Sequence, residues 1–419
     1  MKIMVIGNGA REHALACKLG ESPKVDELYA APGNAGTAAI AHNLDVPATD
    51  IEALARAARQ YGIDLTVVGP EAPLASGIVD LFQSLHLPIF GPTRAATQIE
   101  SSKVFSKELM QKYDIPCAQG MVFSSYSQAR DYVQSQPIPL VIKADGLAAG
   151  KGVVVATSRE QALESLSDFM ERKTLGAASD KVIVEECLNG QEVSLLAFTD
   201  GKNVRSMVPA CDYKRVFDSD QGPNTGGMGS YSPPGFFDQS DVEKIQQTIL
   251  EPAVRAMAAE GMPYKGVLYV GLMVNREGAR VLEFNARFGD PETQAIIPRL
   301  KTDLVDIILA VINGTLDGME IEWSDEACVG VVMASGGYPG KYQSGFSVTG
   351  LDELDSDILV FHAGTAMNNG VVTNGGRVLT VVASGKTLKE ARNRVYADIP
   401  RIHFEGCHYR RDIAAREIA

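Results

Sequence analysis

The residues from 281 to 292 carry the most chemical information in this chain. They read Val-Leu-Glu-Phe-Asn-Ala-Arg-Phe-Gly-Asp-Pro-Glu, and in a strand successive side chains point to opposite faces. One face then carries the polar side chains of Glu283, Asn285 and Arg287. The other face, expected in a core, carries Leu282, Phe284, Ala286 and Phe288. Carboxylate and carboxamide oxygens suit Mg²⁺ and arginine suits phosphate, so the run predicts phosphoryl transfer. For this run alone, an amphipathic edge strand with a solvated polar face is the alternative.

The glycine-rich residues 145–152 are a second candidate for phosphate chemistry. They join two expected strands, which predicts a flap instead of a strand-to-helix phosphate loop. In the Walker pattern four residues separate the glycines, but only three separate Gly146 from Gly150. Gly152 also follows Lys151 where Ser or Thr would bind the metal. Amides on such a flap can close over a polyphosphate and exclude water, so we expect it to be mobile and cut by trypsin at Lys151 without nucleotide, and ordered with it.

The first hundred residues alternate strands and helices. Strands are expected at 2–6, 27–30, 65–68 and 88–90, and helices at 11–19, 51–61 and 74–85. This alternation favours a doubly wound, mainly parallel sheet whose ligand lies beyond the carboxyl ends of the strands, where glycine-bearing loops occur at 7–9, 31–37 and 69–71. Because Glu12 replaces the third glycine of the dinucleotide fingerprint, we favour a phosphate or another polar ligand at the helix N-terminus. Tight turns without a ligand are the alternative for each loop.

The remaining sequence predicts two further units. Helices are expected at 101–113 and 241–260, and strands at 140–143, 153–155, 182–186, 193–198, 266–274 and 280–288. The segments 211–215 and 222–229 show little helix or strand character, and long irregular segments of this kind are usually functional. From Trp323 onward, strands at 328–334, 358–362 and 377–383 and a helix at 388–399 predict an α+β module. We interpret it as a structural cap without a catalytic cluster.

Bulk composition narrows the class of protein. The chain has 419 residues, and at about 150 residues per domain this length predicts about two to four domains. A net charge of −13 argues against coating nucleic acid, although an anionic substrate could bind in a locally basic pocket. The six cysteines lack a C-x-x-C pair, which fits free thiols in a reducing compartment. We find neither a secretory signal nor an apolar run long enough for a membrane span, and we expect a cytoplasmic protein.

Several long motifs occur along the whole chain. They are Gly-Asn-Gly-Ala-Arg-Glu-His-Ala (7–14), Gly-Pro-Glu-Ala-Pro-Leu (69–74), Glu-Ser-Ser-Lys (100–103), Lys-Ala-Asp-Gly-Leu-Ala-Ala-Gly-Lys-Gly-Val (143–153), Asp-Tyr-Lys-Arg (212–215), Gly-Pro-Asn-Thr-Gly-Gly-Met-Gly (222–229), Leu-Glu-Phe-Asn-Ala-Arg-Phe-Gly-Asp-Pro-Glu (282–292) and Val-Phe-His-Ala-Gly-Thr (360–365). Together they closely resemble the phosphoribosylamine–glycine ligase family of the ATP-grasp superfamily. One departure is Ala10, where the family usually has glycine, and a Cβ there costs something if φ is positive or a ligand approaches closely.

The resemblance implies a fold and a reaction. The expected fold is an N-terminal doubly wound parallel-sheet domain (1–100), a central ATP-grasp domain (101–320) with a mobile flap subdomain (about 117–190), and a C-terminal α+β domain (321–419). The expected reaction is the second step of purine synthesis, in which ATP, glycine and 5-phosphoribosylamine give glycinamide ribonucleotide, ADP and phosphate through a glycyl phosphate. Mg²⁺ or Mn²⁺ would assist. The expected partners are these small molecules, without nucleic acid or membrane, and the protein would be a monomer.

The resemblance also implies residue roles. For ATP it implies phosphate contacts from Lys103 and Lys143, a lid that contains Gly150, Lys151 and Gly152, adenine contacts from a hinge with Glu185, Glu186 and Leu188, ribose contacts from Glu192, and Arg215 and Asn224 near the phosphates. Glu283 and Asn285 match the metal ligands. The catalytic residues would be Arg287, Lys143 and Asp212. Glycine and the sugar phosphate would contact Gly9, Arg11, Gly33, Asn34, Gly36, Glu71, Asp212, Asp290, Pro291 and Glu292.

Three alternatives differ in class. Another carboxylate–amine ligase of the superfamily would act on a different acid, but the segments 212–215 and 222–229 resemble the glycine ligases. A non-catalytic nucleotide sensor would have lost Glu283, Lys143 or Arg287, and all three are present. A domain of a fused purine enzyme is a third possibility, against which we note that the chain ends soon after Ile413.

Overall fold

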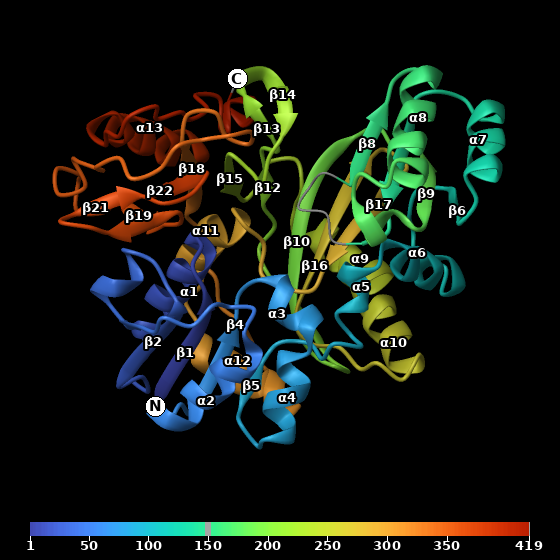
Figure 1. Ribbon diagram of the computed structural model, residues 1–419. Coiled ribbons are helices and arrows are strands. Elements are labelled where there is room, and N and C mark those ends of the chain that lie inside the picture. Colours follow the sequence, from blue (N-terminus) through green and yellow to red (C-terminus); the bar gives the residue numbers. More distant parts are fainter. Residues whose placement is uncertain (147–151, 419) are drawn as a thin grey trace.

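The computed structural model describes residues 1–146 and 152–418, and its N-terminal part is a parallel sheet with helices on both faces (Figure 1). The strand order is β3-β2-β1-β4-β5, formed by His42–Asn43, Glu27–Pro32, Lys2–Gly7, Leu65–Val68 and Ile89–Phe90. Alternation along β1 explains the two layers. Ile3 and Val5 enter one core with helix α1 (Ala10–Gly20), whereas Met4 and Ile6 enter another with helix α2 (Ile51–Tyr61). The predicted doubly wound fold is confirmed.

One predicted helix of this domain is divided. The expected helix at 74–85 is two helices, α3 (Glu71–Ser76) and α4 (Ile78–Ser84). Gly77 between them has a φ of +92°, a backbone conformation that glycine adopts without steric cost and that ends a helix. The chain can therefore turn between the loop that starts α3 and the face of the sheet that α4 covers.

The flap subdomain is a four-stranded antiparallel sheet in the order β6-β9-β7-β8. Its strands are Gly120–Phe123, Val182–Glu186, Leu140–Ala144 and Val153–Ala156, and helices α7 (Tyr126–Ser135) and α8 (Arg159–Leu166) close a core with them. Strands β7 and β8 pair in the predicted antiparallel way. The predicted lid residues Gly150 and Lys151 lie outside the described residues, whereas Gly152 accepts a hydrogen bond from the amide of Ala144 at 2.8 Å.

A second antiparallel sheet forms the body of the central domain. Its order is β11-β10-β16-β17, with strands Val204–Ser206, Gln191–Asp200, Lys265–Asn275 and Gly278–Asn285. Helices α5 (Gln98–Ser101), α6 (Lys103–Lys112) and α12 (Leu304–Asn313) pack around it. The helix expected at 241–260 begins earlier, at Gln239 after the N-cap Asp238, and runs through α9 (Gln239–Ile245), a π-helical turn η5 (Gln246–Leu250) and α10 (Glu251–Ala259).

Strand β17 corrects two details of the predicted alternation. It ends at Asn285 instead of Phe288, and its register with β16 shifts at a bulge between the pairs Gly271–Glu283 and Leu272–Val281. The bulge places an extra residue in β17. As a result Val281 is buried and Leu282, expected in the core, is only half-buried. The prediction holds beyond the bulge, where Phe284, Ala286 and Phe288 are buried and the polar residues between them are not.

The segments expected to be irregular contain short strands. These are β12 (Cys211–Asp212), β13 (Arg215–Phe217), β14 (Gln221–Asn224) and β15 (Gly229–Ser232). Strands β12 and β15 extend the C-terminal sheet, whose order is β12-β15-β18-β22-β19; its other strands are Ala327–Ala334, Arg377–Gly385 and Leu359–His362, and helix α13 (Leu388–Asp398) packs on it. The C-terminal module is therefore continuous with a segment of the central domain.

The other elements are short. They are α11 (Glu292–Ile296), the hairpin of β20 (Thr365–Met367) and β21 (Val371–Thr373), and the single helical turns η1 (Thr37–Ala39), η2 (Ser167–Glu171), η3 (Gly176–Ser179), η4 (Asp218–Asp220), η6 (Ile297–Arg299), η7 (Ile399–Arg401) and η8 (Ala415–Glu417). Across 1–146 and 152–418, every helix is too short or too polar to cross a lipid bilayer.

Candidate active site

Cationic side chains surround the polar face of β17. The Lys143 ammonium donates to the Leu282 carbonyl at 3.0 Å, where the bulge exposes that oxygen. The Lys103 ammonium donates to the Gly146 carbonyl at 3.1 Å. Burial raises the pKa of the Glu283 carboxyl, but Lys214, Lys143 and Lys103 outweigh burial, so the pKa is lowered overall. Three lysines therefore lie near the Glu283 carboxylate, where they could offset the charge of an anionic ligand.

Lys143 belongs to a buried ion triad that sequence reasoning missed in part. The two oxygens of Glu185 contact different lysines, Lys107 Nζ at 3.0 Å and Lys143 Nζ at 2.7 Å. Lys107 is buried and also donates to the Ala118 carbonyl. The Glu185 side chain is therefore engaged inside the protein, and it holds the Lys143 ammonium beside β17. No local pattern distinguished Lys107 from an ordinary helix lysine.

Arg287 is held by carboxylates from two separate elements. Its Nε lies 3.1 Å from Glu71 Oε2, and its Nη2 lies 3.3 Å from Glu100 Oε1. Glu100 also accepts from the amide of Ala286 at 2.7 Å. Burial raises the pKa of Glu100, whereas that of Glu71 is lowered because Arg287 and Arg11 outweigh its burial. Glu71 and Arg287, both predicted site residues, are in contact. Glu100 is the second carboxylate on Arg287; it lies in a recognised motif, but the sequence analysis assigned it no role.

A group of acidic residues lies next to the lysines. Asp212 has its pKa raised to about 7, because burial outweighs the stabilising charge of Lys214. Glu292 is buried and accepts hydrogen bonds from the hydroxyls of Ser194 and Tyr269, each at 3.0 Å. Asp212 is therefore sensitive to a bound charged group through its raised pKa, and the Glu292 side chain is held by two hydroxyl donors.

The C-terminal module, interpreted as a structural cap, contributes one arginine to this region. Arg377 Nη2 on β22 lies 2.7 Å from Asp290 Oδ2. The same guanidinium donates to the Gly226 carbonyl at 2.7 Å. Asp290 also accepts from Gln294 at 2.8 Å. The adjoining Pro291 accepts through its carbonyl from Ser230. The glycine-rich segment and the loop after β17 are thus held together by an arginine from a third part of the chain.

The loops at the carboxyl ends of β1 and β2 reach the same region. Arg11 donates to the Phe288 carbonyl at 3.1 Å, and Glu12 accepts from the amide of Gly9 at 2.6 Å. Asn34 is buried, and its side chain bonds the Asn8 and His362 carbonyls and the Gly36 amide. The Asn34 side chain therefore holds the loops together. Gly33 has a φ of +73°, and Gly36 packs against His13, so a Cβ would clash at either position.

The predicted nucleotide residues other than Lys103, which begins α6, lie on the flap, on β10 and on the ribbon of β13 and β14. Glu186 pairs with Arg280 at 3.1 Å, its neighbour Leu188 follows β9, and Glu192 pairs with Lys214. Arg215 and Asn224 are opposite each other on the ribbon and both are exposed. Most of the predicted site residues that the structure describes therefore lie between the flap, β17 and the first domain. Arg215 and Asn224 lie at the exposed margin of this region.

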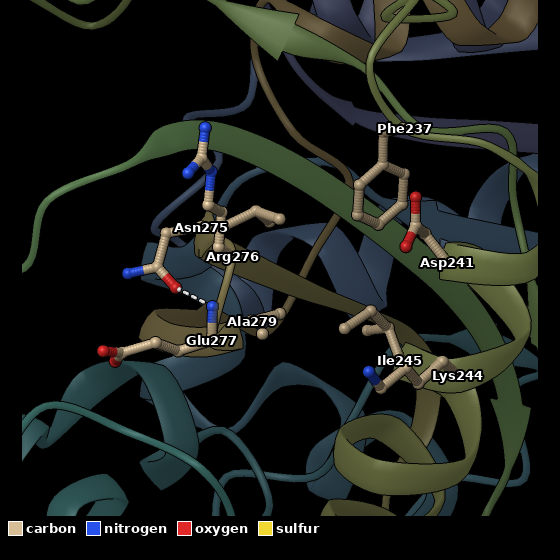
Figure 2. A pocket seen from close by; sticks show the side chains of 10 residues that line it. Phe237, Asp241, Lys244, Ile245, Asn275, Arg276, Glu277 and Ala279 are labelled. Carbon is tan, nitrogen blue, oxygen red and sulfur yellow. Dashed lines mark hydrogen bonds between the residues drawn. The ribbon is translucent and has the colours of Figure 1, made fainter.

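A separate cavity of the structure is lined by other residues than the predicted site. Figure 2 shows it beside α9 and the turn from β16 to β17, where the Glu277 amide donates to Asn275. Its volume is about 230 Å³, and among the residues that the structure describes none of the predicted site residues lines it. The site is therefore defined by its charged side chains and not by this cavity.

An antiparallel flap sheet facing a second antiparallel sheet, with lysines and a carboxylate between them, defines an ATP-grasp protein. The chain belongs to the phosphoribosylglycinamide synthetase family, whose N domain matches residues 1–100, whose ATP-grasp (A) domain matches 101–293 and whose C domain matches 328–416. The recognition of the family from its motifs is confirmed.

Individual relatives agree over the full length. The chain is 49% identical to the phosphoribosylamine–glycine ligase of Caldanaerobacter subterraneus, covering 99% of this chain and 100% of that protein, and 48% identical to that of Escherichia coli, covering 100% and 99%. The crystal structure of the Thermotoga maritima ligase matches with a TM-score of 0.87 and 34% identity over 99% of this chain and 100% of that chain. Biotin carboxylase from Campylobacter jejuni, at 14% identity and a TM-score of 0.76 over 97% and 92%, shares the fold.

Proposed function

We propose that this protein joins glycine to 5-phosphoribosylamine with ATP, giving glycinamide ribonucleotide, ADP and phosphate in the second step of purine synthesis. The proposal is carried by the similarity to phosphoribosylamine–glycine ligases, which are 48% and 49% identical to this chain over nearly its full length. The cations around Glu283 support it, because a reaction between anions needs positive charge that screens their repulsion.

The chemistry has two steps. A free carboxylate is a poor electrophile, so a glycine carboxylate oxygen first attacks the γ-phosphorus of ATP, and the bond to the ADP oxygen breaks. The amine of phosphoribosylamine then attacks the carbonyl carbon of the glycyl phosphate; phosphate leaves and the nitrogen loses a proton. Positioning and electrostatic stabilisation dominate phosphoryl transfer. Arg287, held by Glu71, Glu100 and the Phe288 carbonyl, supplies positive charge and its remaining N–H groups to the transferred group.

We assign the ATP contacts to the flap side of the site. Lys103 and Lys143 take the phosphates, and the 146–152 loop with Gly150, Lys151 and Gly152 covers them. The other proposed contacts are Glu185, Glu186 and Leu188 for adenine, Glu192 for the ribose, and Arg215 and Asn224 near the phosphates. The position of Lys103 and Lys143 beside β17 supports the phosphate assignment. Both ammonium groups now bond carbonyl oxygens, which phosphate oxygens would replace.

The polar face of β17 suits a hard divalent cation, Mg²⁺ or Mn²⁺. Glu283 offers a carboxylate whose pKa is lowered, and Asn285 offers a carboxamide oxygen two residues along the same strand. Within 1–146 and 152–418 no group of three or more His, Cys, Asp or Glu side chains could hold a metal alone. This donor set fits Mg²⁺, which is commonly bound by one or two carboxylates together with substrate phosphates. When bound, the cation would neutralise charge on the phosphates.

We assign glycine and the sugar phosphate to the side formed by the first domain. Asp212, Asp290, Pro291 and Glu292 line one part, and Gly9, Arg11, Gly33, Asn34, Gly36 and Glu71 supply the other. Asp212, with its raised pKa, is suited to accept the proton that the amine loses. We propose domains at 1–100, 101–320 with the flap near 117–190, and 321–419, in a monomeric cytoplasmic enzyme; the six free cysteines support a reducing compartment.

One assay tests this function. Release of ADP is measured with the purified protein, Mg²⁺ and ATP, adding glycine and freshly made phosphoribosylamine separately and together. We expect rapid release only with both substrates, and glycinamide ribonucleotide as the product by mass spectrometry. Release that is unchanged when glycine or the amine is omitted would contradict the proposal. Arg287→Ala, which removes a group that we place at the transferred phosphoryl, is the negative control.

A further inference from the structure

The C-terminal segment 408–412 is hydrogen-bonded to the ribbon formed by β13 and β14. Figure 1 shows the C-terminus beside this ribbon. Arg411 donates its amide to Asp218 at 2.8 Å, and Ser219 donates its amide to Asp412 at 2.8 Å. The ring of His408 contacts the Val216 carbonyl at 2.8 Å. Residues about 190 positions apart in sequence are thus joined by backbone and side-chain bonds.

Arg410 is the central contact. It is completely buried, and its guanidinium forms a fork with both oxygens of Asp412, each at 2.7 Å. The same guanidinium donates to the Arg215 carbonyl at 3.0 Å and to Asp220 at 2.9 Å. It also lies 4.5 Å from the ring centre of Tyr213. A planar fork with several acceptors and a stacked aromatic ring is a geometry that lysine cannot reproduce.

The ribbon depends on these contacts because its own conformation is unfavourable. Ser219 and Asp220 both have positive φ, at 57° and 53°, and side chains other than glycine rarely adopt this region twice in succession. Val216 of β13 is buried beside Met228 and Ala334, but the residues of β14 are all exposed and none in the turn 218–220 is buried, so core burial holds only one strand of the ribbon. The bonds from Arg410 and Asp412 to the turn compensate for its strain.

The ribbon leads directly into the candidate ATP site. Its base is fixed by Thr225, whose amide donates to the Lys214 carbonyl at 2.7 Å. The Lys214 side chain pairs with Glu192, the residue that we assign to the ribose of ATP. Arg215 and Asn224 follow as a cross-strand pair. A displacement of the ribbon would therefore move three groups near the proposed nucleotide.

We propose that Arg410 is a positioning residue, which holds the ribbon so that Lys214, Arg215 and Asn224 face the nucleotide. This proposal rests on the function proposed above. It gives the C-terminal segment a role in the affinity for ATP, although its side chains contact the ribbon and not the reacting atoms.

Paired variants of the full chain test this role. Arg410→Lys removes the fork, and Asp220→Gly removes an exposed tether while accommodating the positive φ. Ser219→Gly is the matched control for Asp220→Gly, because it makes the same kind of backbone change in the same turn and keeps the carboxylate. Arg411→Met is the control for Arg410→Lys, since the Arg411 side chain is exposed.

Two measurements decide the outcome: amide hydrogen exchange in the ribbon and the Kd for a non-hydrolysable ATP analogue with Mg²⁺. We expect Arg410→Lys and Asp220→Gly to speed exchange in 215–224 and to raise the Kd about tenfold, less than the ~10²-fold that a 1 Å misplacement can cost. The KM for glycine should stay within about threefold, because the ribbon is proposed to position ATP contacts only. A general loss of folding would instead affect both substrates. Arg411→Met should match the wild type, and Ser219→Gly should exchange no faster than the wild type and keep its Kd.

Other outcomes overturn the proposal. If Arg410→Lys does not fold, Asp220→Gly alone decides, because that side chain is 63% exposed. Wild-type exchange in Asp220→Gly would show that the tether does not hold the ribbon. Faster exchange with an unchanged Kd would show that the ribbon does not position nucleotide contacts. A wild-type protein that binds no nucleotide would instead overturn the proposed function, while the exchange data would still report whether Arg410 holds the ribbon.

Discussion

Arg377 and Asp290 form an ion pair of 2.7 Å between the C-terminal sheet and the loop that follows β17. Burial raises the pKa of Asp290, but Arg377 and Arg11 outweigh it, so the carboxyl stays ionised to lower pH. Because the Arg377 guanidinium also bonds the Gly226 carbonyl, one cation connects three segments around the proposed substrates. The C-terminal module is therefore part of the structure that orders the site.

Replacing Arg377 should affect both stability and activity. Arg377→Met removes the ion-pair partner of the partly buried Asp290 carboxylate, and breaking a buried pair costs about 3 kcal/mol of unfolding free energy, an upper value for this site. We expect kcat/KM for phosphoribosylamine to fall at least about tenfold through lost positioning. Arg276→Met, at an exposed turn, is the control. The double variant Arg377→Met with Asp290→Asn should regain stability but not activity, which would support the pairing. An unchanged urea midpoint in Arg377→Met would contradict it.

Local patterns predicted what depends on local residues. Alternation along β17 identified Glu283, Asn285 and Arg287 as one polar face, because strand geometry has a period of two. The bulge at Leu282 escaped prediction, since it arises from register against β16. Strands as short as β12 and β13 have too few residues for a periodic signal, so the segments that contain them looked irregular.

Partners distant in sequence could not be predicted from one chain. Lys107 meets Glu185, and Arg377 meets Asp290, only because of tertiary packing. Glu100 is a partial exception, since it lies in a recognised motif although its bond to Arg287 is visible only in the fold. Ionic partners carry no sequence signal when their spacing follows neither helix nor strand periodicity.

Glycine should be strongly preferred over L-alanine as the acid. Glycine has no side chain, and a site built around an unsubstituted Cα must displace protein atoms to admit a methyl. Discrimination of one carbon is commonly about 10–200-fold, and we expect at least that loss in kcat/KM for alanine. The check is ADP release with saturating ATP and phosphoribosylamine. Comparable turnover with alanine, aspartate or glutamate would refute the assignment of glycine.

Two histidines in contact, His13 buried and His362 half-buried, should make stability depend on pH. His13 Nδ1 accepts from the His362 amide at 2.9 Å. Burial lowers the pKa of His13 to about 3 and that of His362 to about 4, from an ordinary 6.5. Below 6.5 the unfolded chain binds more protons than the folded one, so stability is present above pH 6.5 and lost as pH falls towards 4.

Urea unfolding between pH 7.5 and 4 measures this effect. His13→Gln should lower stability at the upper pH and flatten its decline on acidification, because one titrating group is gone. His403→Gln, at an exposed ring, should keep the wild-type slope. Parallel curves for wild type and His13→Gln would show that His13 does not control the acid transition.

Glu283→Gln should abolish most activity while the protein stays folded. The change keeps the shape of the side chain but removes a charge from a site suited to a hard cation, and three lysines then lack their shared carboxylate. We expect kcat to fall about 10²-fold or more and the Mg²⁺ concentration for half-maximal rate to rise. Circular dichroism provides the folding control. Wild-type rate and metal dependence would refute the assignment of this face to a metal.

Arg287→Lys tests the same face through the geometry of its cation. The arginine now contacts Glu71 through Nε, Glu100 through Nη2 and the Phe288 carbonyl through Nη1, so a phosphoryl group would take the second N–H of each Nη. A lysine keeps the charge, but its point-like ammonium cannot contact both carboxylates and a phosphate in one plane. We therefore expect kcat to fall about 10²-fold or more, as when a transition-state donor is removed, with a small change in the Kd for ATP. Arg276→Lys, at the exposed turn before β17, controls for the substitution itself. A rate for Arg287→Lys within a few-fold of wild type would remove Arg287 from the catalytic residues.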